Sequence, residues 1–306
     1  MRVSYIVTVY NKERYLDAVL GHLDGEYSET GGEIIIVNDG STDNSLKIIK
    51  DFAATRDYVI VNDQKNCGVA SATNVGFSLS SCPLVRFVDG DDLLVPGSTK
   101  RLAVALEEHG VGFAYGQYGN YASGDIVMPE ADQFASARIE DPLWQMIRMQ
   151  LFIPSAALAV REVIAGCFPL PEKYRTSQDY IMGIRFAQKT AFAEVKGSCC
   201  LAPKEAPGRL SASQARMYFD TAHILADEIS VNPTWPKRHL RFVIRRTAGR
   251  ALNYARRNTV CGRRQIVWLT FIKMIMSLPF VAFSEKTLIR IADTYVEALK
   301  APDKFP

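Results

Sequence analysis

Several common sequence motifs are absent from this chain of 306 residues, and each absence argues against a class of protein. Its six cysteines form no C-x-x-C pair, and the neighbours Cys199 and Cys200 are poorly placed to bridge. That pattern suits a reducing compartment and argues against structural zinc. No G-x-G-x-x-G follows the first apolar run, which disfavours a dinucleotide-binding oxidoreductase. The opening MRVSYIVTVYNKERY soon becomes charged, unlike a signal peptide, so we expect a cytoplasmic protein.

Acidic residues are also absent from Ile229 to Ser284, a stretch that holds 11 lysines and arginines. With a net charge of +3, the rest of the chain carries −8 (+3 − 11). Arg238–Arg257 reads as a basic amphipathic helix, and Ile266–Phe283 is apolar but marginal for crossing a bilayer. We expect residues 237–283 to lie on an anionic membrane surface, peripheral to its inner face. Alternatively, these helices pack on the first domain or pair two chains into an oligomer; nucleic acid is disfavoured because no recognition motif accompanies the charge.

Short β-branched runs alternate with helical patterns along the first part of the chain. The predicted strands are Val3–Val9, Glu33–Asn38, Tyr58–Asn62 and Leu84–Asp89, and the predicted helices are Arg14–Leu23, Asn44–Ala54, Gly68–Leu79 and Thr99–Glu108. Repeated units of this length predict an α/β fold, with a mainly parallel sheet flanked by helices. Ligands of such sheets bind outside the carboxyl ends of the strands.

The alternation changes beyond Gly110. Here Arg138–Met149 and Tyr180–Lys189 are predicted as helices, Ala156–Val160 as a strand and Ala202–Ser213 as a surface loop. The pattern after this loop is helical to the end of the chain. We therefore predict a first domain over residues 1–213, with halves 1–100 and 101–213, and a C-terminal helical extension over 214–306.

Acidic residues follow three of the four predicted strands. Asp39 ends the second strand, Asp63 follows the third, and the fourth ends in Asp89-Gly90-Asp91-Asp92. In an extended chain, residues two apart point to the same side, so Asp89 and Asp91 could present carboxylates to one volume. Mg²⁺ or Mn²⁺ prefers such oxygen ligands and leaves positions open for substrate phosphates. The simpler interpretation is that these aspartates cap helices and form turns.

The runs VSYIVTVYNKERYLDAVL, EIIIVNDGSTDNSLKII and NCGVASATNVGFSLSSCPLVRFVDGDDLLVPGS resemble family 2 glycosyltransferases of the GT-A fold. The resemblance is strong over residues 3–100 and weaker over 150–213. It implies a nucleotide-sugar pocket, with Asp39 facing the nucleobase and Asp89 and Asp91 handling the ribose and a metal–diphosphate. The residues that it assigns to nucleotide-sugar binding are Thr8, Val9, Tyr10, Glu13, Asp39, Asp63, Asp89, Gly90 and Arg209, and those assigned to the metal are Asp91, Asp89 and Asp92.

The resemblance also implies a catalytic base that opens a helix, and Asp179 in Ser177-Gln178-Asp179-Tyr180 matches best. A carboxylate there could take the proton of an acceptor hydroxyl as it attacks the anomeric carbon, which inverts the configuration. The competing interpretation is a first-turn acid favoured by the helix dipole. Arg209, in a loop that resembles the mobile loop of the family, could reach the diphosphate. The expected reaction is transfer from a nucleotide-sugar, UDP-linked by resemblance, to a glycan or lipid-linked acceptor.

Two departures from the family pattern lie at Thr73, where an arginine is usual nearby, and at Gln178, where an acid is usual. The Q-x-x-R-W motif of processive synthases is missing its tryptophan in Gln145–Met149, which favours one sugar per encounter. A scaffold of the same fold that has lost turnover is an alternative. A nucleotidyltransferase is disfavoured because the turn after the first strand, Tyr10–Glu13, has no glycine.

Overall fold

The computed structural model describes residues 1–122, 126–129, 135–174 and 176–204, together with scattered residues between 220 and 249. The chain divides into two compact units, Met1–Gly208 and Arg209–Pro306. The proposed site lies in the first unit, apart from Arg209, which is outside the described residues. The predicted boundaries of the domains and their halves remain predictions.

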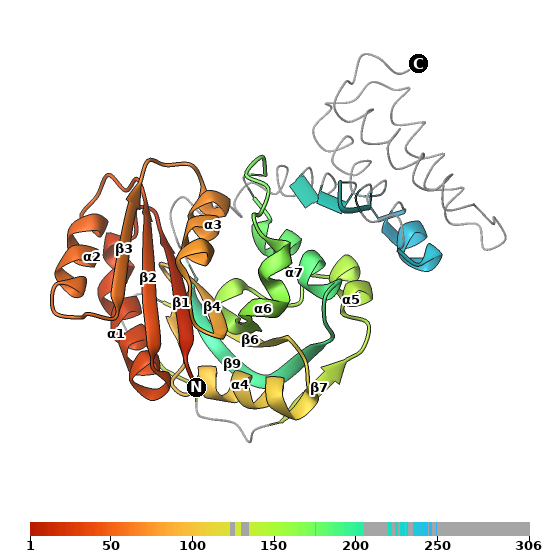
Figure 1. Cartoon of the computed structure of the whole chain (residues 1–306), viewed down its shortest axis with the longest axis horizontal. Helices are drawn as coiled ribbons and strands as arrows, with labels where there is room; N and C mark the ends of the chain where they lie inside the picture. The colour runs from red at the N-terminus through yellow and green to blue at the C-terminus, as the bar shows by residue number, and fades with distance from the viewer. Residues whose placement is uncertain are drawn as a thin grey trace, which may run out of the picture. The chain divides into compact units, whose positions relative to one another are not determined.

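The predicted α/β fold is confirmed, with four parallel strands at its N-terminal side (Figure 1). The elements are, in order, β1 (Val3–Val9), α1 (Glu13–Thr30), β2 (Gly32–Asp39), α2 (Ser45–Ala53), β3 (Val59–Gln64), α3 (Val69–Leu79) and β4 (Leu84–Asp89). β1 is central, because it pairs in parallel with both β2 and β4, while β3 continues the parallel ladder beyond β2. The carboxyl ends of all four strands therefore meet at one edge of the sheet.

The remaining strands turn this ladder into a mixed nine-stranded sheet of order β3-β2-β1-β4-β8-β6-β9-β5, with β7 beside β9. The elements are β5 (Leu93–Leu94), α4 (Ser98–His109), β6 (Phe113–Tyr121), β7 (Ser136–Ile139), α5 (Pro142–Arg148), η1 (Pro154–Ala156), β8 (Ala157–Val160), α6 (Arg161–Ile164), η2 (Ala165–Cys167), α7 (Gln178–Ala187) and β9 (Phe192–Pro203). β8 is antiparallel to both β4 and β6, whereas β9 is parallel to β6. The sheet is thus parallel as far as β4 and mixed after it.

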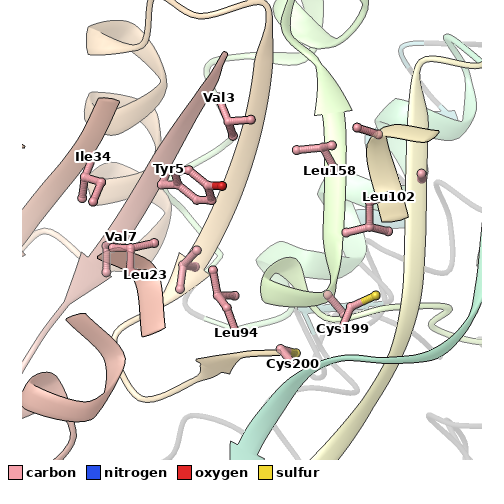
Figure 2. Close-up of a cluster of buried hydrophobic side chains, with 14 of the residues drawn as sticks. Val3, Tyr5, Val7, Leu23, Ile34, Leu94, Leu102, Leu158, Cys199 and Cys200 are labelled. Carbon is pink, nitrogen blue, oxygen red and sulfur yellow. The ribbon is translucent and has the colours of Figure 1, made fainter. Parts of the chain in front are cut away.

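Alternating side chains of β1 supply both faces of the sheet, as the two-residue period of a strand requires. Tyr5 and Val7 face the side covered by α1, where Leu23 packs. Ile6 faces α3, and it lies so close that a Cβ added at Gly76 would be 2.2 Å from its Cγ2. One hydrophobic core extends from β1 and α1 to Leu158 of β8 and Cys199 of β9, as Figure 2 shows. The two parts of the sheet are therefore packed as one body.

The structure corrects two predictions beyond Gly110. Arg138–Met149 is not one helix, because residues up to Ile139 form β7 and α5 begins only at Pro142. Proline suits the first helical turn but not a helix interior, and the Asp141 side chain accepts from the Trp144 N–H as its cap. The predicted loop Ala202–Ser213 is also wrong at its start, since Ala202 and Pro203 end strand β9. Its apolar, cysteine-bearing sequence suits a buried strand.

The described residues of the second unit are helical on both sides of Trp235, in the predicted helices Gln214–Ser230 and Arg238–Arg257 and one residue beyond each, at Val231 and Lys237. Leu240 and Val243, four and seven residues after Pro236, are buried. The other predicted helices of this unit, Gln265–Met276 and Lys286–Lys300, lie outside the described residues. Within the described part of the chain, no helix has both the length and the apolar character of a membrane span.

Candidate active site at the carboxyl ends of the parallel strands

The strand register brings the predicted polar residues together in pairs. Thr8 of β1 lies opposite Asp89 of β4. On the other side of β1, Asn38 of β2 lies opposite Asp63 of β3, and its amide donates to the Asp63 carboxylate at 2.7 Å. The side-chain oxygen of Asn38 is buried with no hydrogen-bond partner. The edge of the sheet therefore carries two polar groupings, one on each side of the end of β1.

Asp39 organises the loop between β3 and α3. Its carboxylate accepts from the Gln64 amide at 2.8 Å and from the backbone N–H groups of Cys67 and Gly68 at 2.9 Å each. Only 4% of the residue is exposed. Gly40 follows with φ of +70°, and a Cβ there would come 2.6 Å from the Asn66 nitrogen, so this approach requires glycine. The geometry shows a loop-building aspartate whose carboxylate is largely occupied.

The loops that follow β1 and β2 are joined by hydrogen bonds. The Asn11 N–H donates to Ser41 Oγ at 3.0 Å, and the Asn11 side chain accepts from the Thr42 N–H at 2.8 Å. Glu13, predicted to line the nucleotide pocket, accepts from the Asn44 N–H at 2.9 Å, so it braces this second loop. Tyr10 keeps 47% of its surface exposed and is available to a ligand.

The acidic segment after β4 is a tight turn, which corrects the extended chain assumed for Asp89 and Asp91. The Asp92 N–H donates to the Asp89 carbonyl at 2.9 Å, and the Gly90 N–H donates to the Thr8 carbonyl at 3.0 Å. Period-two alternation does not apply across such a turn. The acidic turn, residues 89–92, is therefore held against the end of β1 by the backbone.

Ser155, which the sequence analysis did not single out, braces the acidic turn from the other half of the sheet. Its hydroxyl accepts from the Asp89 N–H at 3.0 Å and donates to the Asp92 carboxylate at 2.7 Å. Asp92 is thereby directed toward the protein and is only 3% exposed. The sequence around Ser155 does not indicate this role, because the contact joins residues that are 63 positions apart.

A fully buried arginine, Arg86 of β4, supports Ser155 in turn. Its guanidinium donates to the carbonyl of Ser155 at 2.8 Å and to that of Cys199 at 2.9 Å. Its charge is paired with Glu26 of α1 at 3.4 Å, and Glu26 is only 2% exposed. Burying an ion pair costs desolvation energy that good geometry and further hydrogen bonds must offset. The network ties β4, α1, η1 and β9 together directly behind the acidic turn.

Asp91 is the member of the acidic turn that already holds a cation. Lys12 Nζ lies 2.5 Å from its carboxylate, with side-chain exposures of 23% for the lysine and 10% for the aspartate. Among the described residues, no cluster of three or more His, Cys, Asp or Glu could hold a metal by itself. The Asp91 carboxylate, which here accepts an ammonium group, could nevertheless serve as one ligand of a divalent cation whose other ligands are water and phosphate, as is usual for Mg²⁺.

Asp179, the predicted base, lies in the first turn of α7 and is partly exposed. Its carboxylate accepts from the Tyr180 N–H at 2.8 Å and from the side-chain amide of Gln150. Although the residue as a whole is partly exposed, desolvation of its carboxyl group by the surrounding protein raises the pKa of Asp179, and these hydrogen bonds lower it by less, so the pKa stays above its usual value. The residue before the helix, Ser177, has a φ of +62°, a conformation that residues other than glycine seldom adopt.

The two departures from the family pattern contact each other. The Gln178 amide donates to Thr73 Oγ1 of α3 at 3.2 Å, across 105 positions in sequence. Gln178 directly precedes Asp179, and α3 begins after Gly68, whose N–H binds Asp39. The structure thus connects the predicted base to the predicted nucleobase loop through α3. A neutral hydrogen bond occupies the positions where the family pattern has charged residues.

The four parallel strands carry carboxylates at their carboxyl ends, and the same sheet continues beyond β4 with mixed strand directions. This architecture defines an α/β protein of the GT-A class. The chain matches glycosyl transferase family 2 over residues 4–168, more than half of its length, and it belongs to that family. Over 122 residues it is 34% identical to the glycosyltransferase GlyA of Streptococcus pneumoniae, covering 39% of this chain and 17% of that protein. The chain spans 17%, 57% and 41% of the length of three curated relatives that it matches.

Solved structures share the fold. TarS 1–349 of S. aureus in complex with UDP-GlcNAc has a TM-score of 0.68 and 16% identity, covering 100% of this chain and 93% of that one. The mannosyltransferase PcManGT of Pyrobaculum calidifontis, in complex with GDP-Man and Mn²⁺, has a TM-score of 0.53 and 15% identity, with coverage of 99% and 88%. At such low identity the likeness establishes the fold alone.

Proposed function

We propose that this chain is an inverting glycosyltransferase that moves one sugar from a nucleotide-sugar to a hydroxyl of a glycan or lipid-linked acceptor. The observation that carries the proposal is the acidic turn 89–92, which Ser155 braces so that Asp91 remains at the edge of the sheet. A UDP-linked donor is the first choice, since UDP-GlcNAc is bound in the related TarS structure. The bound Mn²⁺ of the mannosyltransferase structure supports a divalent cation.

The donor would lie across the ends of β1, β2 and β4. Tyr10 has an exposed ring that could stack on a base, and Asp39 and Asp63 lie at neighbouring strand ends. Asp91 would hold Mn²⁺ or Mg²⁺, with Asp89 beside it at the end of β4. Bound there, the cation would neutralise charge on the departing diphosphate. We assign Asp92 to shaping the turn, because its carboxylate accepts from the Ser155 hydroxyl.

Asp179 would act as the general base. The acceptor oxygen forms a bond to the anomeric carbon, the bond from that carbon to the diphosphate oxygen breaks, and the acceptor proton passes to the Asp179 carboxylate. A raised pKa makes this carboxylate a better proton acceptor, provided that it is ionised at the working pH. Gln150 and the Tyr180 N–H would hold it in one orientation.

The basic stretch 237–283 would place the enzyme on the inner face of an anionic membrane, close to a lipid-linked acceptor. Most of that stretch lies outside the described residues, so its charge pattern carries this part of the proposal. Flotation of the full chain with phosphatidylglycerol vesicles, but not with phosphatidylcholine vesicles, is the expected result.

The central test compares Asp179→Asn with wild type and with Asp51→Asn, a control at an exposed position of α2. A panel of UDP- and GDP-sugars with Mn²⁺ identifies the donor by thermal shift, because a ligand that binds the folded state raises its melting temperature. We expect Asp179→Asn to lower transfer by about 10²- to 10⁴-fold and to leave the donor-induced shift intact. NMR of the product should show an inverted anomeric centre.

The scaffold alternative predicts a different outcome. A chain that binds nucleotide yet neither transfers nor slowly hydrolyses any donor of the panel would overturn the enzyme proposal. Retention of the anomeric configuration, or full transfer by Asp179→Asn, would remove Asp179 from the role of base.

A further inference from the structure

We propose that Lys12 is a built-in counter-ion of Asp91 that a divalent cation must displace, so that the protein binds metal weakly until a nucleotide diphosphate is present. The inference rests on the proposed function, because it takes Asp91 as the metal-binding carboxylate. Its starting observation is the 2.5 Å ion pair between Lys12 Nζ and Asp91, which joins the loop after β1 to the acidic turn across 79 residues of sequence.

The backbone of Lys12 is fixed, so only its side chain is free to change partners. Its N–H donates to Ser45 Oγ at 2.8 Å. Its carbonyl accepts from the N–H groups of Tyr15 at 2.9 Å and Leu16 at 3.2 Å, which closes the first turn of α1. The flexible side chain of Lys12 can therefore change its conformation, and its ammonium group can leave Asp91 while the backbone of the loop keeps its position.

The position of Lys12 favours pairing of its ammonium group with a nearby anion. Lys12 caps the N-terminus of α1, where the helix carries partial positive charge and disfavours a cation. The ammonium also lies 5.9 Å from the centre of the Tyr15 ring, a weak attraction by comparison. Asp91 supplies the compensating charge, and both side chains are more than three-quarters buried, so the pair is less screened than an exposed one.

Gly90 lets the acidic turn approach closely enough for this pair to form. A Cβ at this position would come 2.9 Å from the Thr8 carbonyl oxygen and 3.4 Å from Lys12 Cγ. Any larger residue would push the turn away from β1 and from the lysine stem. Gly90, directly after β4, therefore allows Lys12 and Asp91 to lie close together.

Lys12 and a divalent cation then compete for one carboxylate, because an ammonium in contact with Asp91 repels a second cation there. A diphosphate changes this competition, since its oxygens offer the ammonium a second anionic partner. The nucleotide would draw Lys12 away from Asp91, and the cation would take its place between carboxylate and phosphate. Nucleotide and metal therefore favour each other's binding, and by linkage the effect is equal in both directions.

The experiment is a Mn²⁺ titration of the full chain, read from the electron paramagnetic resonance of free Mn²⁺, with and without UDP. It compares wild type, Lys12→Met, which keeps the length of the stem, and Lys50→Met as the control on the exposed face of α2. Without UDP we expect Lys12→Met to bind Mn²⁺ about three- to tenfold more tightly than wild type, the scale expected for losing a partly buried pair and its repulsion. The gain in Mn²⁺ affinity caused by UDP should shrink in the same variant.

Two other results of the titration would overturn the inference, and they differ in the part of it that fails. If UDP-dependent Mn²⁺ binding is lost in Asp91→Asn but Lys12→Met equals wild type without UDP, the metal site stands and the competition does not. If wild type binds no Mn²⁺ even with UDP, the metal part of the proposed function fails together with this inference. Thermal melting of each variant confirms that it is folded before titration.

Discussion

The two halves of the sheet hold their candidate site residues by different means. In the half built on β1 to β4, backbone groups hold the positions with support from side chains: two N–H groups donate to Asp39, and a backbone turn braced by Ser155 carries Asp91. In the half that follows, the Asp179 carboxylate depends on one neighbouring N–H and on the side-chain amide of Gln150. A site residue that is held mainly by backbone groups should keep its position after many substitutions. One that is held by a single side chain should lose its position when that side chain is replaced.

The largest effect is expected from the buried arginine that joins the two halves. Arg86→Met removes the partner of Glu26 and leaves a carboxylate uncompensated in the core. Breaking a buried pair in this way costs about 3–5 kcal/mol of unfolding free energy, measured by urea denaturation. Arg86→Met/Glu26→Gln should recover part of that loss. A single variant as stable as wild type would mean that the network does not hold the halves together.

A smaller effect is expected at the brace of the acidic turn. Ser155→Ala leaves the Asp89 N–H and the Asp92 carboxylate without this partner, which should cost about 1–3 kcal/mol in unfolding free energy. Because Asp91 shares that turn, affinity for UDP with Mn²⁺ should fall by about tenfold, measured by calorimetry. Ser78→Ala, at an exposed position of α3, is the control. Unchanged affinity would show that the backbone alone shapes the turn.

In the second half, Gln150→Leu should shift the pH profile of transfer. The amide hydrogen bond favours the charged form of Asp179, so its removal raises a pKa that burial has already raised. Activity is lost as the pH falls through that pKa, and the acid limb of kcat/KM should therefore move to higher pH. Gln188→Leu, near the other end of α7, should leave the profile in place. A fall in rate with no shift of the limb would indicate a purely structural role.

The same pKa has a consequence for stability, with the opposite sign from that of most aspartates. Because folding raises the pKa of Asp179, the folded state binds a proton more tightly than the unfolded state does. The contribution of this group to stability therefore falls as the pH rises through its folded pKa. Asp179→Asn should flatten that dependence in urea denaturation between acidic and neutral pH. A steeper dependence in the variant would contradict the direction of the shift.

The smallest effect is expected from the link between Thr73 and Gln178. A double-mutant cycle of Thr73→Val and Gln178→Leu should give a coupling of about 0.5–1 kcal/mol in unfolding free energy, as for one neutral hydrogen bond. Each single variant should lower transfer only a few-fold. Strictly additive changes would show that the contact does not help to position α7.

The contrast between the halves also explains which features the sequence could predict. Strand ends such as Asn38-Asp39 and Asp89–Asp92 are local signals, because a β-branched run and the polar residues after it are contiguous. Ser155, Arg86 and Gln150 act through partners far along the chain, and an isolated serine, arginine or glutamine does not reveal such a partner. Lys12 is intermediate: the sequence shows only that it belongs to a turn without glycine, and the tertiary fold pairs it with Asp91.

The late position of β9 in the chain has a consequence for synthesis. Leu93 and Leu94, just after the acidic turn, pair with Leu201 and Cys200 of this strand. The family match ends at residue 168, so a nascent chain can expose all of it before β9 has left the ribosome. Until then β5, which directly follows the acidic turn, lacks its partner strand, and Arg86 lacks its contact with the Cys199 carbonyl. The residues of the candidate donor site are therefore synthesised before β9, which completes the sheet beside them.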